Sequence, residues 1–352
     1  MIMNKMSKNT IKISLATMLL GLLSCSSEES VDNIVNSDVL RINTNIAPTR
    51  SIIEGANFSE GDKVQLSISG AANGVYNAEA TLSEGSWSIS PKVVLGRQRA
   101  GVSGYANLIE TIEPDETGNQ NDILFGVSTL SDGYAVNWQN PVANMQFYHL
   151  LSRVTFELRQ ANGSNRLKQV SLVNVEKGRA ISTQVPIYTI KNYAEKASLD
   201  ISQIGLLAGK EYTAEEKEKV QEEYNSYVTK ILDQIESSLN PNYYENPSSL
   251  AKNVDEQLSD KPFSVSLLVL PTIISSYDHV QLQVVLEVNE VDKVYAIEIP
   301  EIVWNSNKHY KYPVSIDLSS DKLVPLSIGD VSIEKWGTPK TLDGKVIDTY
   351  MD

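Results

Sequence analysis

Alternation of apolar and polar residues in short runs is the feature that most constrains this chain. The clearest runs cover residues 64–68, 154–158, 265–270, 280–288, 295–299 and 312–318. A strand with one buried face requires a period of two, whereas a helix requires a period of about 3.6. Glycines separate the early runs at turn-like intervals, and no glycine-rich phosphate loop follows a strand. We therefore expect a mainly β chain built from antiparallel sandwich strands.

Residues 213–239 depart from this pattern and show helical spacing. Thr213 and Glu216 form a capping box, in which each side chain reaches the backbone N–H of the other residue. Pro241 would end the helix. The apolar stripe consists of Val220, Tyr224, Tyr227, Val228, Ile231 and Ile235. We predict an inserted amphipathic helix, and covering one sandwich face is favoured over binding a partner.

The charged and sulfur-containing residues exclude several classes of function. The chain has 44 acidic and 30 basic residues, a net charge of −14 and no basic tract, which makes it a poor nucleic-acid binder. Its single cysteine excludes internal disulfides and thiolate metal clusters. His149, His279 and His309 lie far apart in the sequence, and His149 is expected to pack or to hydrogen-bond. We expect no metal, no cofactor and no nucleic-acid partner.

Residues 1–24 have the pattern of a secretory signal peptide. Three lysines precede an apolar stretch at 13–23, which is shorter than the roughly 20 residues that span a bilayer. The segment 22–25 (LLSC) then resembles the bacterial lipoprotein box. This resemblance implies that the Cys25 thiol is acylated and that Cys25 begins the mature protein. The alternative is an incidental buried cysteine after an ordinary signal.

Residues 25–38 are polar and are predicted to form a solvated tether. The segment 26–29 (SSEE) resembles the surface-export signal of Bacteroidetes lipoproteins, which implies a location on the cell outer membrane, facing outward. The alternative is that these residues belong only to the tether.

Several segments resemble, in this order, the fimbrillin family of pilin-like surface lipoproteins. They are 58–66 (FSEGDKVQL), 85–88 (GSWS), 121–126 (NDILFG), 146–156 (QFYHLLSRVTF), 269–271 (VLP), 303–312 (VWNSNKHYKY) and 328–336 (IGDVSIEKW). Each segment alone is a common pattern. The resemblance to the family depends on their order and on the lipoprotein signal peptide that precedes them. Asn307 stands where the family has a turn glycine, and asparagine also tolerates a positive φ.

The resemblance implies two tandem transthyretin-like, Greek-key β-sandwich domains, 39–142 and 143–337, with the helix inserted in the second. It implies a subunit or adhesin of a surface fimbria (a type V-like pilus) with other fimbrial subunits as partners. The alternative is a non-polymerising surface lipoprotein that binds glycans or host protein. Candidate residues for stacking on sugars are Trp87, Tyr105, Trp138, Tyr243 and Tyr244.

Catalysis is not expected. Segments 319–322 and 332–335 match the S-x-x-K pattern of β-lactamases. That chemistry needs the serine to open a helix so that the lysine lies one turn away. Both segments lie in strand-like sequence, so we do not expect an enzyme.

Processing is implied at Arg50. Residues 39–46 read as one strand, and 48–51 (PTRS) read as an exposed loop behind it. In fimbrillins that polymerise, an arginine-specific protease cuts such a loop and removes the first strand with the lipid anchor. The resemblance therefore places a cut between Arg50 and Ser51, and the alternative is an ordinary loop arginine.

The C-terminal tail, 338–352, is the candidate donor strand for assembly. It follows Trp336, the last residue expected in the core, and it closes no obvious strand pair of its own. Its apolar candidates for filling a partner's groove are Val346, Ile347 and Tyr350. The alternative is a frayed or self-packed terminus.

Anchoring through Cys25 leads to the first testable prediction. Cys25→Ala should abolish metabolic labelling with a palmitate analogue, because the substitution removes the acylated thiol. Ser24→Ala should stay labelled, since a small residue still precedes the cysteine. Labelling that survives in Cys25→Ala would contradict the assignment.

Overall fold

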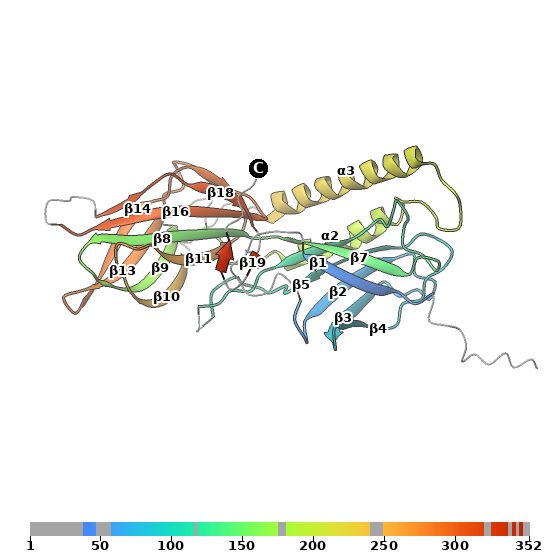
Figure 1. Cartoon of the computed structure of the whole chain (residues 1–352), viewed down its shortest axis with the longest axis horizontal. Coiled ribbons are helices and arrows are strands. Elements are labelled where there is room, and N and C mark those ends of the chain that lie inside the picture. Colours follow the sequence, from blue (N-terminus) through green and yellow to red (C-terminus); the bar gives the residue numbers. More distant parts are fainter. Residues whose placement is uncertain are drawn as a thin grey trace, which may run out of the picture. The chain divides into compact units, whose positions relative to one another are not determined.

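A computed structural model describes residues 38–46, 58–115, 118–174, 181–239, 249–319, 325–336, 340–342 and 345–347, all within one compact unit, Asp38–Asp352. Strands predominate in these ranges, and two α-helices accompany them (Figure 1). The prediction of a mainly β chain is confirmed. Neither of these two helices is long and apolar enough to cross a membrane.

The first seven strands form one sheet, the N-terminal sheet, in the order β1-β7-β6-β5-β2-β3-β4. They are β1 (Arg41–Ile46), β2 (Lys63–Ser69), β3 (Asn77–Ser83), β4 (Ser86–Ser90), β5 (Gly101–Ala106), β6 (Leu124–Thr129) and β7 (Val142–His149). β1 runs parallel to β7, and the other neighbours are antiparallel. The two outer strands, β1 and β4, contact each other. The sheet therefore bends around a core that contains Leu66, Val102 and Phe147.

This sheet differs from the sandwich domain that the sequence predicts for residues 39–142. Its strands lie in one bent sheet instead of two facing sheets. It also includes β7, which pairs with both β6 and β1, so the pairing continues past the predicted division at 142/143. The alternation within β7 gives no sign of this, because it shows which residues are buried and not which strand lies beside them.

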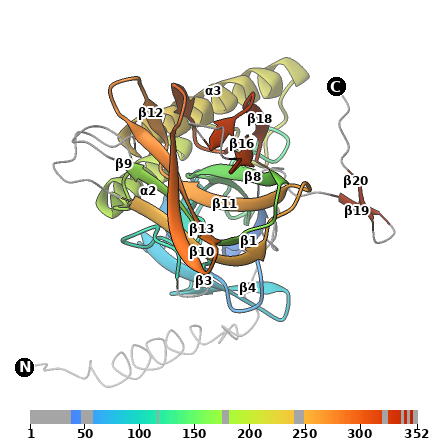
Figure 2. The ribbon, with the colours of Figure 1, turned by 90° about the vertical axis from the view of Figure 1, so that its left-hand side faces the viewer.

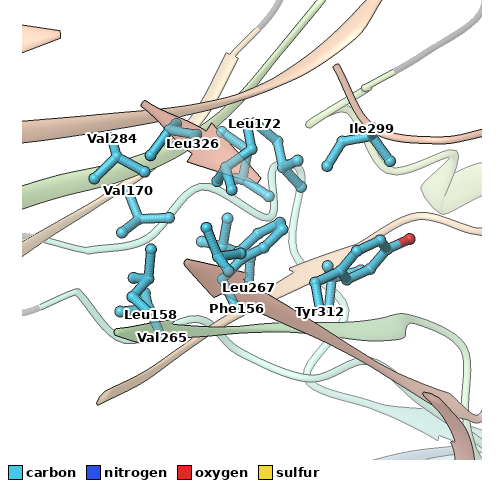
Figure 3. Close-up of a cluster of buried hydrophobic side chains, with 14 of the residues drawn as sticks. Phe156, Leu158, Val170, Leu172, Val265, Leu267, Val284, Ile299, Tyr312 and Leu326 are labelled. Carbon is cyan, nitrogen blue, oxygen red and sulfur yellow. The ribbon is translucent and has the colours of Figure 1, made fainter. Parts of the chain in front are cut away.

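The second half of the chain contains two sheets. One has β8 (Ser152–Asn162), β11 (Phe263–Val269), β16 (Lys308–Asp317), β17 (Leu326–Ile328) and β18 (Ser332–Lys335); the other has β9 (Arg166–Asn174), β10 (Ser249–Gln257), β13 (Val280–Val288) and β14 (Val291–Glu298). Their strands can be followed in Figure 2. Side chains of both sheets, among them Phe156, Leu172, Val284 and Tyr312, converge in one core (Figure 3). This half is a β-sandwich. Two short pairs complete the described strands: β12 (Thr272–Ile274) with β15 (Ile302–Trp304), and β19 (Lys340–Leu342) with β20 (Lys345–Ile347).

Helix α3 (Ala214–Leu239) confirms the helix predicted at 213–239. Its capping box is formed, since the Glu216 N–H donates to Thr213 Oγ1 at 3.2 Å and the Thr213 N–H donates to Glu216 Oε2 at 2.8 Å. Tyr224, Val228 and Ile231 are buried in one cluster with Phe125 and Val127 of β6. The helix thus covers a face of the N-terminal sheet, although the sequence assigns it to the second domain.

Helix α2 (Ile187–Ile201) was not predicted. It contains Ala194, Ala197 and Ile201 at helical spacing, but it is short and lacks a side-chain cap at Pro186. α2 packs on β2, β5 and β6 and contacts α3. Together the two helices bury the outer face of the bent sheet.

A glycine allows α2 to approach β5 this closely. A Cβ atom at Gly101 would lie 1.9 Å from the Ser198 carbonyl oxygen and 2.7 Å from the Ser202 nitrogen, both backbone atoms of the α2 region. Ser103, also in β5, donates its hydroxyl to the Ala194 carbonyl oxygen. The helix therefore packs directly on the strand backbone.

We expect Gly101→Ala to lower the free energy of unfolding by about 1–3 kcal/mol, because neither backbone atom can yield without moving α2. Gly96→Ala is the matched control, since its Cβ would meet only side-chain atoms at ordinary contact distance, Ala72 Cβ at 3.4 Å and Gln98 Cγ at 4.0 Å. It should change the stability by no more than about 0.5 kcal/mol. Urea denaturation of both variants measures this, and equal stability of the two would refute the packing argument.

Candidate strand-exchange site

Strand β1 alternates strictly between the core and solvent. Leu40, Ile42 and Ile46 are buried, whereas Arg41 and Asn43 are exposed. The sequence prediction of one strand at 39–46 is confirmed by β1 and the bridge between Val39 and Val94. Burial of each large aliphatic side chain contributes about 1.5–3 kcal/mol. The apolar face of β1 is therefore a large part of the N-terminal core.

Backbone hydrogen bonds hold β1 along one edge and at its start. All six residues of β1 pair in parallel with 142–147 of β7. The Leu40 N–H donates to the Val93 carbonyl oxygen at 3.0 Å, and the Leu95 N–H donates to the Asp38 carbonyl oxygen at 2.8 Å. Outside the ladder, the Asn43 amide donates to Asn144 Oδ1 at 3.0 Å. β1 is thus an outer strand of the sheet with β7 as its ladder partner.

Aromatic side chains close the other side of β1. The Trp87 indole N–H donates to Thr44 Oγ1 at 3.2 Å. Phe58 meets both the Trp87 ring at 5.2 Å and the Phe147 ring at 5.0 Å, edge to face in each case. We call the space that β1 fills between β7 and these rings the β1 seat. It is bordered by Phe58, Trp87, Met145 and Phe147.

The predicted processing and anchoring residues fall outside the described residues. Arg50 and Ser51 lie in 47–57, and Cys25 lies in 1–37. β1 ends at Ile46, four residues before Arg50. A cut at Arg50 would therefore separate β1 from β2 in the covalent chain.

The candidate donor residues are placed only in part. Val346 and Ile347 lie in β20, which pairs with β19 of the same tail, whereas Tyr350 is outside the described residues. The expectation that the tail closes no strand pair of its own is therefore wrong. The backbone of Thr341 pairs with that of Val346, and an Asp-Gly sequence between two short strands is a strong signal for such a hairpin.

The residue that precedes the tail, Trp336, is held in a core. Trp336 is fully buried, as predicted, and its ring stacks on that of His149 at 4.2 Å. His149 is 7% exposed and hydrogen-bonds Asp122, so it packs and hydrogen-bonds as expected. The tail therefore follows a residue whose side chain is fixed by packing.

A buried polar network joins β8, β11 and β16. Thr155 Oγ1 lies 2.7 Å from both His309 Nε2 and Ser266 Oγ, and Arg153 donates to the same Ser266 oxygen at 3.0 Å. Burial, with the neighbouring charges of Arg153 and Lys311, lowers the pKa of His309 to about 3, and burial lowers the pKa of Arg153 to about 10. His309 is therefore neutral at pH 7. Arg153 and His309 are 4% and 3% exposed, so the network ties strands together out of reach of a substrate.

The residues considered in the sequence for catalysis, sugar stacking and metal binding have the following places in the structure. Ser332 and Lys335 both lie in strand β18, which does not provide the helical turn that S-x-x-K chemistry needs. Trp87 and Tyr105 are half-buried, whereas Trp138 is 40% exposed. Tyr243 and Tyr244 lie outside the described residues. Within the described ranges, no three His, Cys, Asp or Glu side chains gather as metal ligands do.

The sequence model of the fimbrillin-like family matches residues 97–336, more than half of the chain. The chain belongs to this family. The matched region extends from the loop before β5 to Trp336 and includes both helices. No curated protein matches this fimbrillin-like chain.

A solved structure shares its fold, and two others align less closely. A candidate cell adhesion protein from Bacteroides ovatus aligns with a TM-score of 0.52 and 13% identity, over 85% of this chain and 97% of that one. A fimbrial protein from Bacteroides vulgatus aligns at a TM-score of 0.42 and 9% identity, over 85% and 99% of the two chains. The tip fimbrial protein Mfa3 from Porphyromonas gingivalis aligns at 0.41 and 9% identity, over 85% and 100%.

The β1 seat leads to a stability prediction. Ile42→Ala should lower the free energy of unfolding by about 2–4 kcal/mol, because it opens a cavity between β1 and Ala143. Arg41→Ala, on the exposed face of the same strand, should stay within about 0.5 kcal/mol of wild type. Chemical denaturation compares the two, and an Ile42→Ala protein as stable as Arg41→Ala would show that β1 contributes little to the core.

Proposed function

We propose that this fimbrillin-like chain is a structural subunit or adhesin of a cell-surface fimbria, made as a lipid-anchored precursor and assembled by strand exchange after proteolysis. The observation that carries the proposal is β1, an outer strand that fills an apolar seat and leads directly into the segment with Arg50. Membership of the fimbrillin-like family supports the same reading. In this proposal Cys25 anchors the precursor to the outer membrane, and other fimbrial subunits are the partners.

Loss of β1 would leave two unfavourable surfaces. The outer edge of β7 would expose unpaired N–H and C=O groups, and Met145 and Phe147 would lose the apolar side chains that cover them. Such an edge is a template for β-augmentation by an extended segment from another chain. Because the donor and the seat are different parts of the molecule, the contact is head-to-tail and continues as a filament.

The proposed donor is the C-terminal tail, 338–352. Val346 and Tyr350 lie four residues apart, so an extended donor strand would present both on the face that enters a neighbour's apolar seat, with Ile347 on the opposite face. The β19–β20 hairpin would have to open first, which exchanges the few backbone bonds of a short pair for a longer ladder. Trp336 would remain in its own core and fix the start of the donated strand.

The domain description belongs to the same proposal. We infer that both halves derive from the tandem transthyretin-like, Greek-key domains that the family resemblance implies. The two-sheet sandwich of the second half supports this, and in the first half the approach of β1 to β4 gives one bent sheet two facing walls. A single sheet with this curvature encloses a core as a sandwich does.

A second candidate function is a non-polymerising adhesin. It is favoured by one observation, the exposed Trp138, whose N–H bonds to Gly96 two residues before Gln98, one of the residues that line a polar cavity. This role needs neither cleavage at Arg50 nor the tail.

Assembly is tested by digestion and truncation. Digestion of the folded precursor with an arginine-specific protease should give Ser51 as the new N-terminus, and Arg50→Ala should block both the cut and filament formation. A chain that ends at Gly337 should fold and be cut, yet form no filaments by electron microscopy, because it lacks the donor strand. A chain with Val346→Asp and Ile347→Asp should behave like the truncation, whereas Lys345→Gln should assemble.

Two outcomes would overturn the proposal. Filaments of normal length from the truncated chain would eliminate the tail as donor. An Arg50–Ser51 bond that resists the protease in the folded protein, with filaments still formed, would eliminate processing at this loop.

A further inference from the structure

Three segments far apart in the sequence meet at one end of the N-terminal sheet. The Ala100 N–H donates to the Val136 carbonyl oxygen at 2.7 Å, and the Ala135 N–H donates to the Leu206 carbonyl oxygen at 2.9 Å. The Trp138 N–H donates to the Gly96 carbonyl oxygen at 3.1 Å. The segment before β5, the segment before β7 and the segment after α2 are therefore joined through their backbones.

A cavity of about 510 Å³ opens beside this junction. Its side chains are almost all polar, namely Ser69, Gln98, Arg99, Ser202 and Gln203, with Leu207 as the apolar exception. Pockets for small ligands have volumes of about 300–1,000 Å³, and most are lined mainly by apolar side chains. A cavity of ligand size with a polar lining matches a ligand that is itself rich in hydroxyl or carboxylate groups.

The polar groups are held in place by one another. Gln98 donates its amide to the Gly70 carbonyl oxygen at 3.1 Å, and Gln203 donates its amide to Ser202 Oγ at 3.0 Å. Gly70 has φ +86° and lies so close to the Arg99 carbonyl oxygen that a Cβ atom would be 2.3 Å from it. These bonds use only part of each amide, and each side-chain carbonyl oxygen can still accept a bond from a ligand.

Arg99 gives the cavity its charge. Its guanidinium donates to the Gln203 carbonyl oxygen at 3.0 Å, and among the described residues it forms no ion pair with a carboxylate. A guanidinium fork suits a carboxylate of a ligand.

The backbone of Trp138 lies near this cavity. Its N–H bonds to the carbonyl oxygen of Gly96, two residues before Gln98, which lines the cavity, and Trp138 is 40% exposed. An exposed indole ring offers a rigid apolar face with a polar edge. An exposed aromatic side chain near a cavity lined by amides, hydroxyls and a cation offers the kinds of group that can recognise an acidic sugar.

We propose that this cavity binds a carboxylated sugar residue, such as a uronic or sialic acid at the end of a glycan. Arg99 holds the carboxylate, and Gln98, Gln203 and the serines hydrogen-bond the ring hydroxyls. Trp138 packs against the apolar face of the sugar ring or of the next residue. The site needs neither the β1 seat nor the tail, so it stands apart from the assembly proposed above.

The test uses the full chain as a monomer, titrated by isothermal calorimetry and saturation-transfer NMR. The probes are oligosaccharides that end in N-acetylneuraminic acid or glucuronic acid, their neutral counterparts without the carboxylate, and an acidic peptide. We expect binding of at least one acidic sugar and binding of its neutral counterpart that is about 10-fold weaker or more. Arg99→Gln should remove this preference for the acidic sugar.

Arg97→Gln is the matched control, because it is the same substitution at a position two residues from Arg99. Arg97 is exposed and does not line the cavity. It should bind as wild type does. Gln98→Ala and Trp138→Ala should each weaken binding, and Gln98→Ala keeps the test decisive if Arg99→Gln does not fold. Thermal melting identifies the folded variants.

Several results would overturn the proposal. One is the absence of binding to either acidic sugar at millimolar concentration. Another is equal binding by wild type, Arg99→Gln and Gln98→Ala. A third is an acidic peptide that binds through Arg99 more tightly than the sugars, which would assign the cavity to peptides. None of these results bears on filament formation, and failed filament assembly would not affect sugar binding.

Discussion

The apolar core behind an open sheet edge has to be covered, and in this protein β1 covers it. Ile42 and Ile46 fill the space against β7, while the backbone of β1 satisfies the outer N–H and C=O groups of that strand. Both requirements can be met by any extended segment with the same alternation, because neither depends on how that segment is connected to the rest of the chain. This exchangeability is the physical basis of the assembly proposed above.

The helices and the N-terminal sheet share a core that is separate from the core that β1 covers. α2 and α3 bury Phe125 and Val127, and the same cluster takes in Leu268 at the end of β11 and Trp336 at the start of the tail. Contacts from both halves of the sequence therefore meet in one place. A tail that moves beyond Trp336 would leave this cluster intact, as would the removal of β1, which packs in a different cluster.

The polar network of the second half and the polar cavity at the end of the N-terminal sheet differ in whether their hydrogen-bonding groups are already paired. Arg153, Thr155 and His309 are buried and hydrogen-bond one another through Thr155 and the half-buried Ser266, so their hydrogen bonds serve the strands that carry them. The polar side chains at the end of the N-terminal sheet are arranged around open space instead, with Arg99 in no ion pair among the described residues. Satisfied burial favours a unique packing, whereas positioned groups that face a cavity have capacity left for a ligand.

The sequence by itself determined what depends on neighbours within a few residues. The alternation in β1, β13 and β16 predicts strands because each side chain's burial follows from its parity, and the capping box of α3 is closed between Thr213 and Glu216. The burial of Trp336 and the order of the family segments were also readable. α2 was missed because tertiary packing on β5, more than its own caps, stabilises it.

Only the tertiary structure decided which strands lie together. β1 pairs with β7 across about a hundred residues, the helices cover the first sheet although the sequence assigned α3 to the second domain, and the cavity draws Ser69, Arg99 and Gln203 from three separate segments. The alternation of a strand shows which of its residues face a core, but it does not show which strand or helix packs on the other side of that core. The partner is chosen by the combined fit of side-chain volumes and backbone edges over the whole unit, and no local pattern encodes that sum.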